Sequence, residues 1–359
     1  MPTSTFRTLG NSRAPREHRP RQNCLAEDAL PQYSNNIPMI ESEIRVQEEP
    51  VCDAWQGTIQ AILGIFVLVT VALVAHYYPS SNRSTELETE VQSLRYEVQQ
   101  LKQEETMPAL VLDRYRDSIC YIFGVYQVGF DGRAPELRAR VSGSGFVVAS
   151  GFLATNRHVA EPWFQDPDSA VLIRKGAKPH LEKLLAYFPG LPLPINVTAA
   201  ALSAEGDLAV LHIEDSQAVR QLRPLPLAEN PPNPGELVSV VGYPMGILGM
   251  VAKSPPAIYD RLAYRRDDQG AASELAALSL IRPSATCGHL GDVVGDKLIY
   301  DAPTAHGASG GPVFDSHGEV IGINAAYLDG FSGGTLGVSV RALKPLIKSA
   351  ETIAKSNSK

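Results

Sequence analysis

The chain has 359 residues, of which 44% are hydrophobic and 20% charged, and its formal net charge is -7. This composition is typical of a globular protein and leaves room for a two-part domain with appendages. The mild acidity excludes the basic footprint of a nucleic-acid-binding protein. Four cysteines are too few for a disulfide framework, and two free buried thiols are favoured over one bridge for the later pair. The cysteines are Cys24, Cys52, Cys120 and Cys287.

The chain begins with a polar tail followed by an apolar segment. Residues 1–53 are rich in Pro, Arg, Asn and Glu without a sustained period, which predicts disorder. Residues 54–78 carry no Asp, Glu, Lys or Arg and are long enough to cross a hydrocarbon core of roughly 30 Å. Trp55 at one end and Tyr77 with Tyr78 at the other suit the two membrane interfaces. A buried core helix and a cleaved signal peptide fit less well, so we predict an uncleaved signal anchor.

The charges beside the anchor say little about its orientation. Arg45 on one side and Arg83 on the other nearly cancel, and only the more distant arginines of the tail favour a cytoplasmic N-terminus. With that orientation, everything after the anchor lies outside the cytoplasm, in the periplasm if the organism is bacterial.

Residues 84–106 have the apolar spacing of a coiled coil, alternating steps of four and three. In a parallel homodimer Glu90 would face Arg95 of the other chain. Glu97 would likewise face Lys102. The alternative is a single amphipathic helix packed on its own domain, and Pro108 is expected to end the segment. The seam positions are Leu87, Val91, Leu94, Val98 and Leu101.

From about residue 110 the chain consists of short β-rich runs separated by Gly, Pro and Asp, such as SICYIFGVYQV, LVSVVGY and KLIYDAP. This pattern of short strands separated by turns predicts an all-β sandwich or a pair of barrels. Residues 245–279 are the exception and indicate a partly helical insertion, either a lid over a cleft or, as we favour, a surface decoration. The run RALKPLIKSAETIAK predicts an amphipathic helix near the end of the chain.

The stretch HGASGGPVF places Ser309 among small residues, which suits either an exposed nucleophile with free backbone N–H groups or a plain hairpin. A nucleophilic serine needs a base and a group that orients the base. His158 follows the predicted strand FLAT, and Asp207 directly precedes the apolar run LAVLHI. Each residue alone has an ordinary structural explanation, but the three together favour a Ser-His-Asp triad. The pair His158 and Glu161 has weak metal-ligand spacing, and we expect no metal.

The segments GSGFVVASGFLATNRHV, GDLAVLHIE and HGASGGPVFDSHGEVIGINAA resemble the trypsin-like serine peptidases of the HtrA type. The resemblance covers roughly residues 110–348. It implies two six-stranded antiparallel barrels with an active site between them, in a protease domain spanning residues 107–352. HtrA-type enzymes usually carry C-terminal PDZ domains, and we expect none here because too few residues follow the protease domain.

By resemblance, His158 is the general base, Asp207 orients it, Ser309 is the nucleophile, and the N–H groups of Gly307 and Ser309 form the oxyanion hole. The expected lining of the primary substrate pocket contains no acid, which argues against cleavage after Arg or Lys and suits small or aliphatic side chains. That lining is Thr304, Asn324, Ala325, Ala326 and Val338.

The sequence therefore predicts a membrane-anchored serine endopeptidase that acts on unfolded or flexible protein segments without a cofactor. It is expected to form a homo-oligomer through residues 84–106; the seam favours a dimer, whereas HtrA-type proteins are often trimers. One alternative is a catalytically idle binding or sensor protein of the same fold. Another is a membrane scaffold in which the coiled coil is the functional part.

Overall fold

The structure is a computed structural model that describes residues 54–77, 82–327 and 334–357. Its contacts divide the chain into two units, residues 1–80 and 81–359. The described part of the first unit is helix α1, Ala54–Tyr77. Within it, Gly57–His76 has a mean hydropathy of 2.5 and no buried residue, so this helix is long and apolar enough to cross a membrane.

Helix α2, Asn82–Tyr115, opens the second unit. The prediction that Pro108 ends this helix was wrong, because Pro108 lies inside it. A proline costs one intrahelical hydrogen bond, and here tertiary packing offsets that loss, since Met107 and Val111 on either side are buried in the main core. Tyr115 at the end of the helix stacks on Phe314 with the ring centroids 5.4 Å apart.

The first half of α2 is different. Its five seam residues are exposed, from 44% for Val91 to 62% for Leu101. The seam therefore has no partner among the described residues of this chain, which disagrees with a helix packed along its whole length on its own domain.

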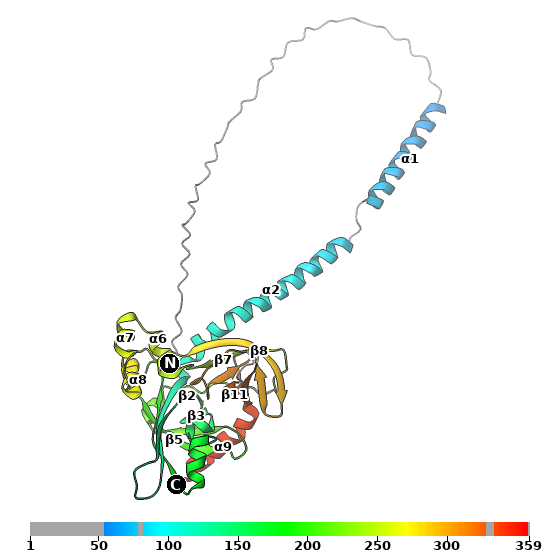
Figure 1. Ribbon diagram of the computed structural model, residues 1–359. Coiled ribbons are helices and arrows are strands. Elements are labelled where there is room, and N and C mark those ends of the chain that lie inside the picture. Colours follow the sequence, from blue (N-terminus) through cyan, green and yellow to red (C-terminus); the bar gives the residue numbers. More distant parts are fainter. Residues whose placement is uncertain (1–53, 78–81, 328–333, 358–359) are drawn as a thin grey trace, which may run out of the picture. The chain divides into compact units, whose positions relative to one another are not determined.

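The first barrel is closed and antiparallel, with the strand order β1-β2-β3-β6-β5-β4. Strands β2, β3 and β5 of this barrel are labelled in Figure 1. Alternate strand residues such as Ile122, Leu153 and Leu211 fill its interior and are fully buried. Short helices α3 (Arg157–Ala160) and α4 (Pro167–Arg174) lie between the third and fourth strands. The six strands are β1 (Ile119–Gly129), β2 (Leu137–Ala149), β3 (Phe152–Thr155), β4 (Lys178–Tyr187), β5 (Ile195–Leu202) and β6 (Ala209–Ile213).

Helix α5 (Ser216–Val219) follows, and the second barrel closes in the order β10-β11-β12-β9-β8-β7. Two closed six-stranded antiparallel barrels confirm the predicted fold. The predicted amphipathic helix is α9 (Val340–Asn357), which buries Leu343 and Ala350 in the main core. The strands are β7 (Leu237–Gly242), β8 (Ser284–Val294), β9 (Lys297–Tyr300), β10 (Pro312–Phe314), β11 (Val320–Tyr327) and β12 (Thr335–Ser339).

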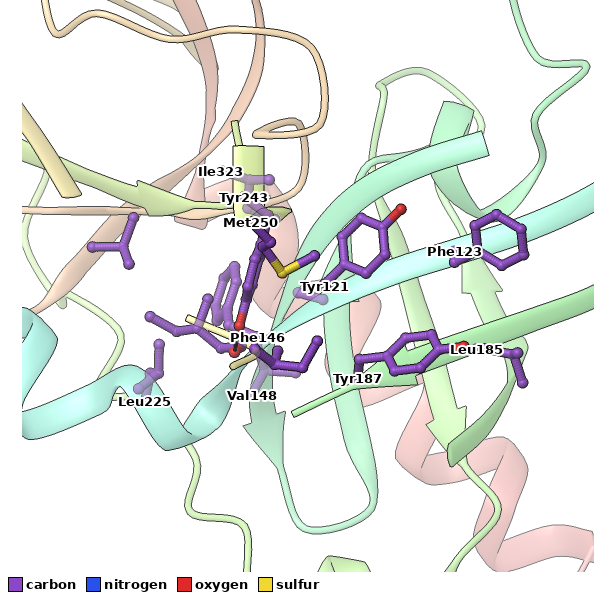
Figure 2. Close-up of a cluster of buried hydrophobic side chains, with 14 of the residues drawn as sticks. Tyr121, Phe123, Phe146, Val148, Leu185, Tyr187, Leu225, Tyr243, Met250 and Ile323 are labelled. Atoms are coloured by element: carbon purple, nitrogen blue, oxygen red, sulfur yellow. Dashed lines mark hydrogen bonds between the residues drawn. The ribbon is translucent and has the colours of Figure 1, made fainter. Parts of the chain in front are cut away.

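The two barrels share the main core, part of which is drawn in Figure 2. The ring of Tyr121 from β1 lies 6.0 Å from that of Tyr187 in the same barrel and 5.8 Å from that of Tyr243, which follows β7 of the other barrel. The hydroxyl of Tyr243 donates a hydrogen bond of 2.9 Å to the carbonyl of Ile119. The two barrels are therefore joined at Tyr243 both by apolar packing of its ring and by the hydrogen bond of its buried hydroxyl.

The segment 245–279 forms three helices, α6 (Gly246–Ala252), α7 (Pro256–Leu262) and α8 (Asp268–Ala277). The partly helical character agrees with the prediction, whereas the interpretation of the segment as a surface decoration was wrong. Met250 and Leu275 are buried in the main core, so the segment fills space that the barrels alone leave open. Polar contacts then join α8 to the first barrel: Arg140 pairs with Asp268 at 2.6 Å, and Lys183 donates to Gln269 at 2.9 Å.

The two cysteines that follow the anchor are both free. Cys120 is buried inside the first barrel, whereas Cys287 on β8 of the second barrel is exposed. A bridge between them is not formed, and the expectation that both thiols are buried was wrong for Cys287. Burial raises the pKa of the Cys120 thiol well above its usual range, so this side chain stays protonated and unreactive at neutral pH.

The packing of the helical insertion can be tested by stability. Leu275→Ala removes a fully buried side chain and is expected to lower the free energy of unfolding by about 2–5 kcal/mol. The matched control is Leu278→Ala, three residues on, where the side chain is 44% exposed. Urea unfolding followed by circular dichroism measures both, and equal stabilities for the two variants would contradict the placement of α8 in the core.

Thiol accessibility gives a second test. Iodoacetamide applied to the native protein at about pH 8 should alkylate Cys287 and leave Cys120 unmodified, because only the thiolate of an accessible cysteine reacts. Peptide mass spectrometry after digestion locates the label. In urea both residues should react, and native labelling of Cys120 would show that the first barrel is not closed as described.

Candidate active site

The first barrel contributes a histidine and a carboxylate. Strand pairing places Thr155 of β3 opposite Ala209 of β6, so the residues just beyond these strand ends meet. His158 Nδ1 lies 2.7 Å from Asp207 Oδ2, and the His158 backbone N–H donates to Asp207 Oδ1 at 2.9 Å. A carboxylate only accepts hydrogen bonds, so the proton of neutral His158 belongs on Nδ1 and the lone pair on Nε2.

The carboxylate is itself held in place by a residue that sequence reasoning missed. Asn156 is fully buried before α3 and donates from Nδ2 to the backbone carbonyl of Asp207 at 2.8 Å. Its only signal in the sequence was its position two residues before His158. The effect is to fix the turn that carries Asp207, so both carboxylate oxygens stay on His158.

The second barrel contributes the loop before β10. Gly307 and Gly310 have φ of +91° and +89°, a left-handed backbone that favours glycine. Among the residues that the structure describes, no acceptor takes the N–H of Gly307 or of Ser309. Backbone donors that are left without an acceptor in the described part of the chain are the kind of group that can stabilise a developing negative charge.

Ser309 and His158 reach the same part of the first barrel. A Cβ added to Gly143 of β2 would lie 2.7 Å from Val159, the neighbour of His158, and 3.3 Å from the carbonyl oxygen of Ser309. The hydroxyl of Ser309, however, donates to the carbonyl of Ala325 at 3.0 Å. In this state the hydroxyl is not bonded to His158.

The expected pocket residues divide into two groups. Asn324 is buried, its Oδ1 accepts from the hydroxyl of Tyr300 at 2.8 Å, and its Nδ2 donates to Thr304 at 3.2 Å. Ala325 contributes the carbonyl that holds Ser309. Burial raises the pKa of Tyr300, so its hydroxyl remains a donor. Tyr300 was not predicted, although its strand leads directly to Thr304.

Val338 does not belong to this group. In the register of β11 and β12, Gly337 is paired with Asn324, and Val338 with Ile323. Because side chains alternate across a strand, Val338 points to the opposite face, where it packs on the main core. Gly337 takes the expected place beside Asn324, and the side chain of Ala326 lies outside the described residues.

Among the side chains that the structure describes, no group of three or more His, Cys, Asp or Glu could hold a metal ion. Glu161, which has weak metal-ligand spacing to His158, instead pairs with Arg157 at 2.8 Å.

A family profile described as a trypsin-like peptidase domain matches residues 143–323, just over half of the chain. The chain belongs to the trypsin-like peptidase family. A protein of Rhizobium meliloti named as a probable periplasmic serine endoprotease, DegP-like, is 27% identical over 215 residues, or 58% of this chain and 33% of the relative. A serine protease of Mycobacterium tuberculosis is 27% identical over 190 residues, covering 53% of this chain and 37% of the relative. The HtrA-type resemblance of the three motifs is thereby confirmed.

The chain spans only about a third of the length of these curated relatives, 33% and 37%. Solved structures are similar as well. A serine endoprotease from Yersinia pestis matches with a TM-score of 0.42 and 17% identity, over 67% of this chain and 65% of the other. The active form of a protease from M. tuberculosis matches with a TM-score of 0.43 and 17% identity, over 67% and 83%.

Proposed function

We propose that this protein is a membrane-anchored serine endopeptidase that cleaves protein chains through an acyl-enzyme intermediate. The observation that carries the proposal is the Asp207–His158 hydrogen bond of 2.7 Å beside a serine whose own N–H and that of Gly307 have no protein acceptor among the described residues. These contacts support His158 as the base, Asp207 as the orienting acid, Ser309 as the nucleophile and the two N–H groups as oxyanion donors.

The chemistry begins when the Ser309 hydroxyl rotates from the carbonyl of Ala325 to Nε2 of His158. Its oxygen attacks the peptide carbonyl carbon while its proton passes to Nε2, and Asp207 stabilises the resulting imidazolium. The electron pair of the carbonyl moves to its oxygen, and two backbone N–H groups donate hydrogen bonds to the resulting oxyanion. Each such donor contributes about 3 kcal/mol to the transition state.

The proton on His158 then passes to the leaving nitrogen as the C–N bond breaks, and an ester to Ser309 remains. A water molecule gives a proton to the same Nε2 and attacks the ester carbon. Collapse of this second tetrahedral intermediate returns the proton to the Ser309 oxygen and releases the acid. No step needs a metal or an organic cofactor.

Flexible or unfolded protein segments are the proposed substrates, because an extended backbone must reach the junction of the barrels. Of the residues expected to line the primary pocket, Thr304, Asn324 and Ala325 carry no charge. This neutral lining supports small or aliphatic side chains at the cleaved position, since a basic side chain would lose its hydration without gaining an acid partner.

Helix α1 supports membrane anchoring through residues 54–78, with the N-terminus in the cytoplasm and the protease domain outside it. The named relative from R. meliloti is described as periplasmic, which agrees with that orientation. The exposed seam of α2 supports self-association through residues 84–106, as a parallel dimer in which complementary charges flank the seam.

One observation favours a second candidate function, a catalytically idle binding or sensor protein of the same fold. The Ser309 hydroxyl donates to Ala325 and not to His158. If this bond persists with substrate present, the serine is not activated and the junction of the barrels only binds peptides.

An active-site probe separates the two functions. The full-length protein in detergent should react with a fluorophosphonate and cleave unfolded casein, and Ser309→Ala should lose both by about 10⁴-fold or more. Ser316→Ala, a change of the same kind at an exposed serine beyond β10, is the matched control and should behave as the wild type. Absence of both signals from folded wild-type protein would support the idle binding protein.

Self-association through α2 can be tested by measuring the mass of the protein in solution. Leu94→Asp puts a charge in the apolar seam and should convert a dimer into a monomer, because a buried unpaired carboxylate opposes association. Gln92→Asp adds the same charge outside the seam and should leave the dimer intact. Light scattering with correction for bound detergent measures the protein mass. A monomeric wild type would contradict self-association through α2, and a trimer would contradict the parallel dimer.

A further inference from the structure

The backbone carbonyls of the loop that carries Ser309 are all held by hydrogen bonds. Every carbonyl from residue 306 to residue 309 accepts one, while the N–H groups of Gly307 and Ser309 have no acceptor among the residues that the structure describes. The donors come from three parts of the chain. The bonds are Met245 N–H to His306 O at 2.6 Å, Ser144 Oγ–H to Gly307 O at 2.8 Å, Gly311 N–H to Ala308 O at 3.0 Å and Ser144 N–H to Ser309 O at 2.7 Å.

These carbonyl bonds determine where the free N–H groups point. In a trans peptide the N–H is directed opposite to the carbonyl of the preceding residue. Holding the carbonyl of His306 therefore aims the N–H of Gly307, and holding that of Ala308 aims the N–H of Ser309. The peptide between them, joining Gly307 to Ala308, links the two donor peptides, and a rotation of this middle peptide would turn both.

The middle peptide is fixed at both ends. Its N–H, that of Ala308, donates to the carbonyl of Ala305 at 3.0 Å. Its carbonyl, that of Gly307, accepts from the hydroxyl of Ser144. Ser144 belongs to β2 of the first barrel, 163 residues away in sequence, and is fully buried.

The hydroxyl of Ser144 has no freedom to point elsewhere. It accepts from the backbone N–H of Tyr243 at 3.0 Å, so its single proton is directed to Gly307. The backbone of the same residue is also held, because its carbonyl accepts from the hydroxyl of Thr155 at 2.7 Å. Ser144 thus connects the first barrel, the start of the helical insertion and the Ser309 loop in one buried network.

We propose that Ser144 is a positioning residue that presets the oxyanion hole from the opposite barrel, an inference that rests on the proposed peptidase function. Ser144 touches neither substrate nor the reacting atoms. Its hydroxyl holds the peptide between the two donor peptides, so the N–H groups of Gly307 and Ser309 face the same point before substrate arrives. Without the hydroxyl, the Gly307 carbonyl and the Tyr243 N–H lose their partner in a buried place, and the loop gains freedom to turn.

The test compares Ser144→Ala with Ser239→Ala in the full-length protein. Ser239 is equally buried, and its hydroxyl donates to a strand carbonyl, that of Thr286, at 3.2 Å. Active sites are first titrated with a fluorophosphonate, and kcat and KM for a peptide substrate are then measured per titrated site. Loss of oxyanion stabilisation lowers kcat about 10- to 100-fold with KM nearly unchanged. Ser239→Ala should match the wild type.

A peptide aldehyde gives a second kinetic readout, because the oxygen of its hemiacetal occupies the oxyanion hole. Its affinity should fall in Ser144→Ala by the same factor as kcat. A Ser144→Ala protein with fewer titratable sites but unchanged kcat per site would have only a structural defect, and that result would overturn the proposal. Ser144→Cys, of similar volume and with a weak donor, replaces Ser144→Ala if the latter does not fold.

Hydrogen exchange distinguishes a failure of this proposal from a failure of the proposed function. Mass spectrometry of the peptide that contains residues 305–311 should show faster amide exchange in Ser144→Ala than in Ser239→Ala. This readout does not need activity. If the wild type is inactive but exchange is faster in Ser144→Ala, the peptidase function is rejected, and Ser144 remains the residue that holds the loop. If Ser144→Ala and Ser239→Ala exchange at the same rate, the proposed role of Ser144 is overturned.

Discussion

The site depends on one constraint, that the main chain of a loop in the second barrel is bonded to a strand of the first. Ser144 on β2 donates twice to the Ser309 loop, from its N–H and from its hydroxyl. His158 and Asp207 belong to the first barrel, and Ser309 with its free N–H groups to the second. If the barrels slid against each other, His158 and Ser309 would separate, so these two bonds help to fix the relative positions of the residues of the proposed triad.

The apolar core supports the same junction. Tyr243 illustrates how, because its ring packs beside Tyr121, its hydroxyl donates to Ile119 and its N–H donates to Ser144. Directly after it begins the helical insertion, whose first residue, Met245, holds the carbonyl of His306. Burial of α6 and α8 therefore stabilises the segment that donates the hydrogen bond from Met245 to the Ser309 loop.

The chemical groups are divided between rigid and adjustable parts. His158 is fixed through both oxygens of Asp207, and the backbone donors of the loop are fixed through their carbonyls. The hydroxyl of Ser309 is the adjustable group, because its one hydrogen bond goes to the carbonyl of Ala325 and it can turn about a single torsion angle. In the proposed mechanism, such an arrangement would stabilise the transition state without reorganisation of the backbone during the reaction.

Local patterns in the sequence predicted an all-β sandwich or a pair of barrels, the apolar helix α1, the amphipathic helix α9 and the candidates His158, Asp207 and Ser309, because each is marked by residues close together in the chain. The two six-stranded barrels followed from the resemblance of three motifs to a known family. Tertiary structure alone decided that α2 continues through Pro108, that Val338 faces the core, that Cys287 is exposed and that residues 245–279 are partly buried. It also decided the place of Ser144, which meets Gly307 across 163 residues. Such features depend on which surfaces meet after folding, and no short-range pattern records that.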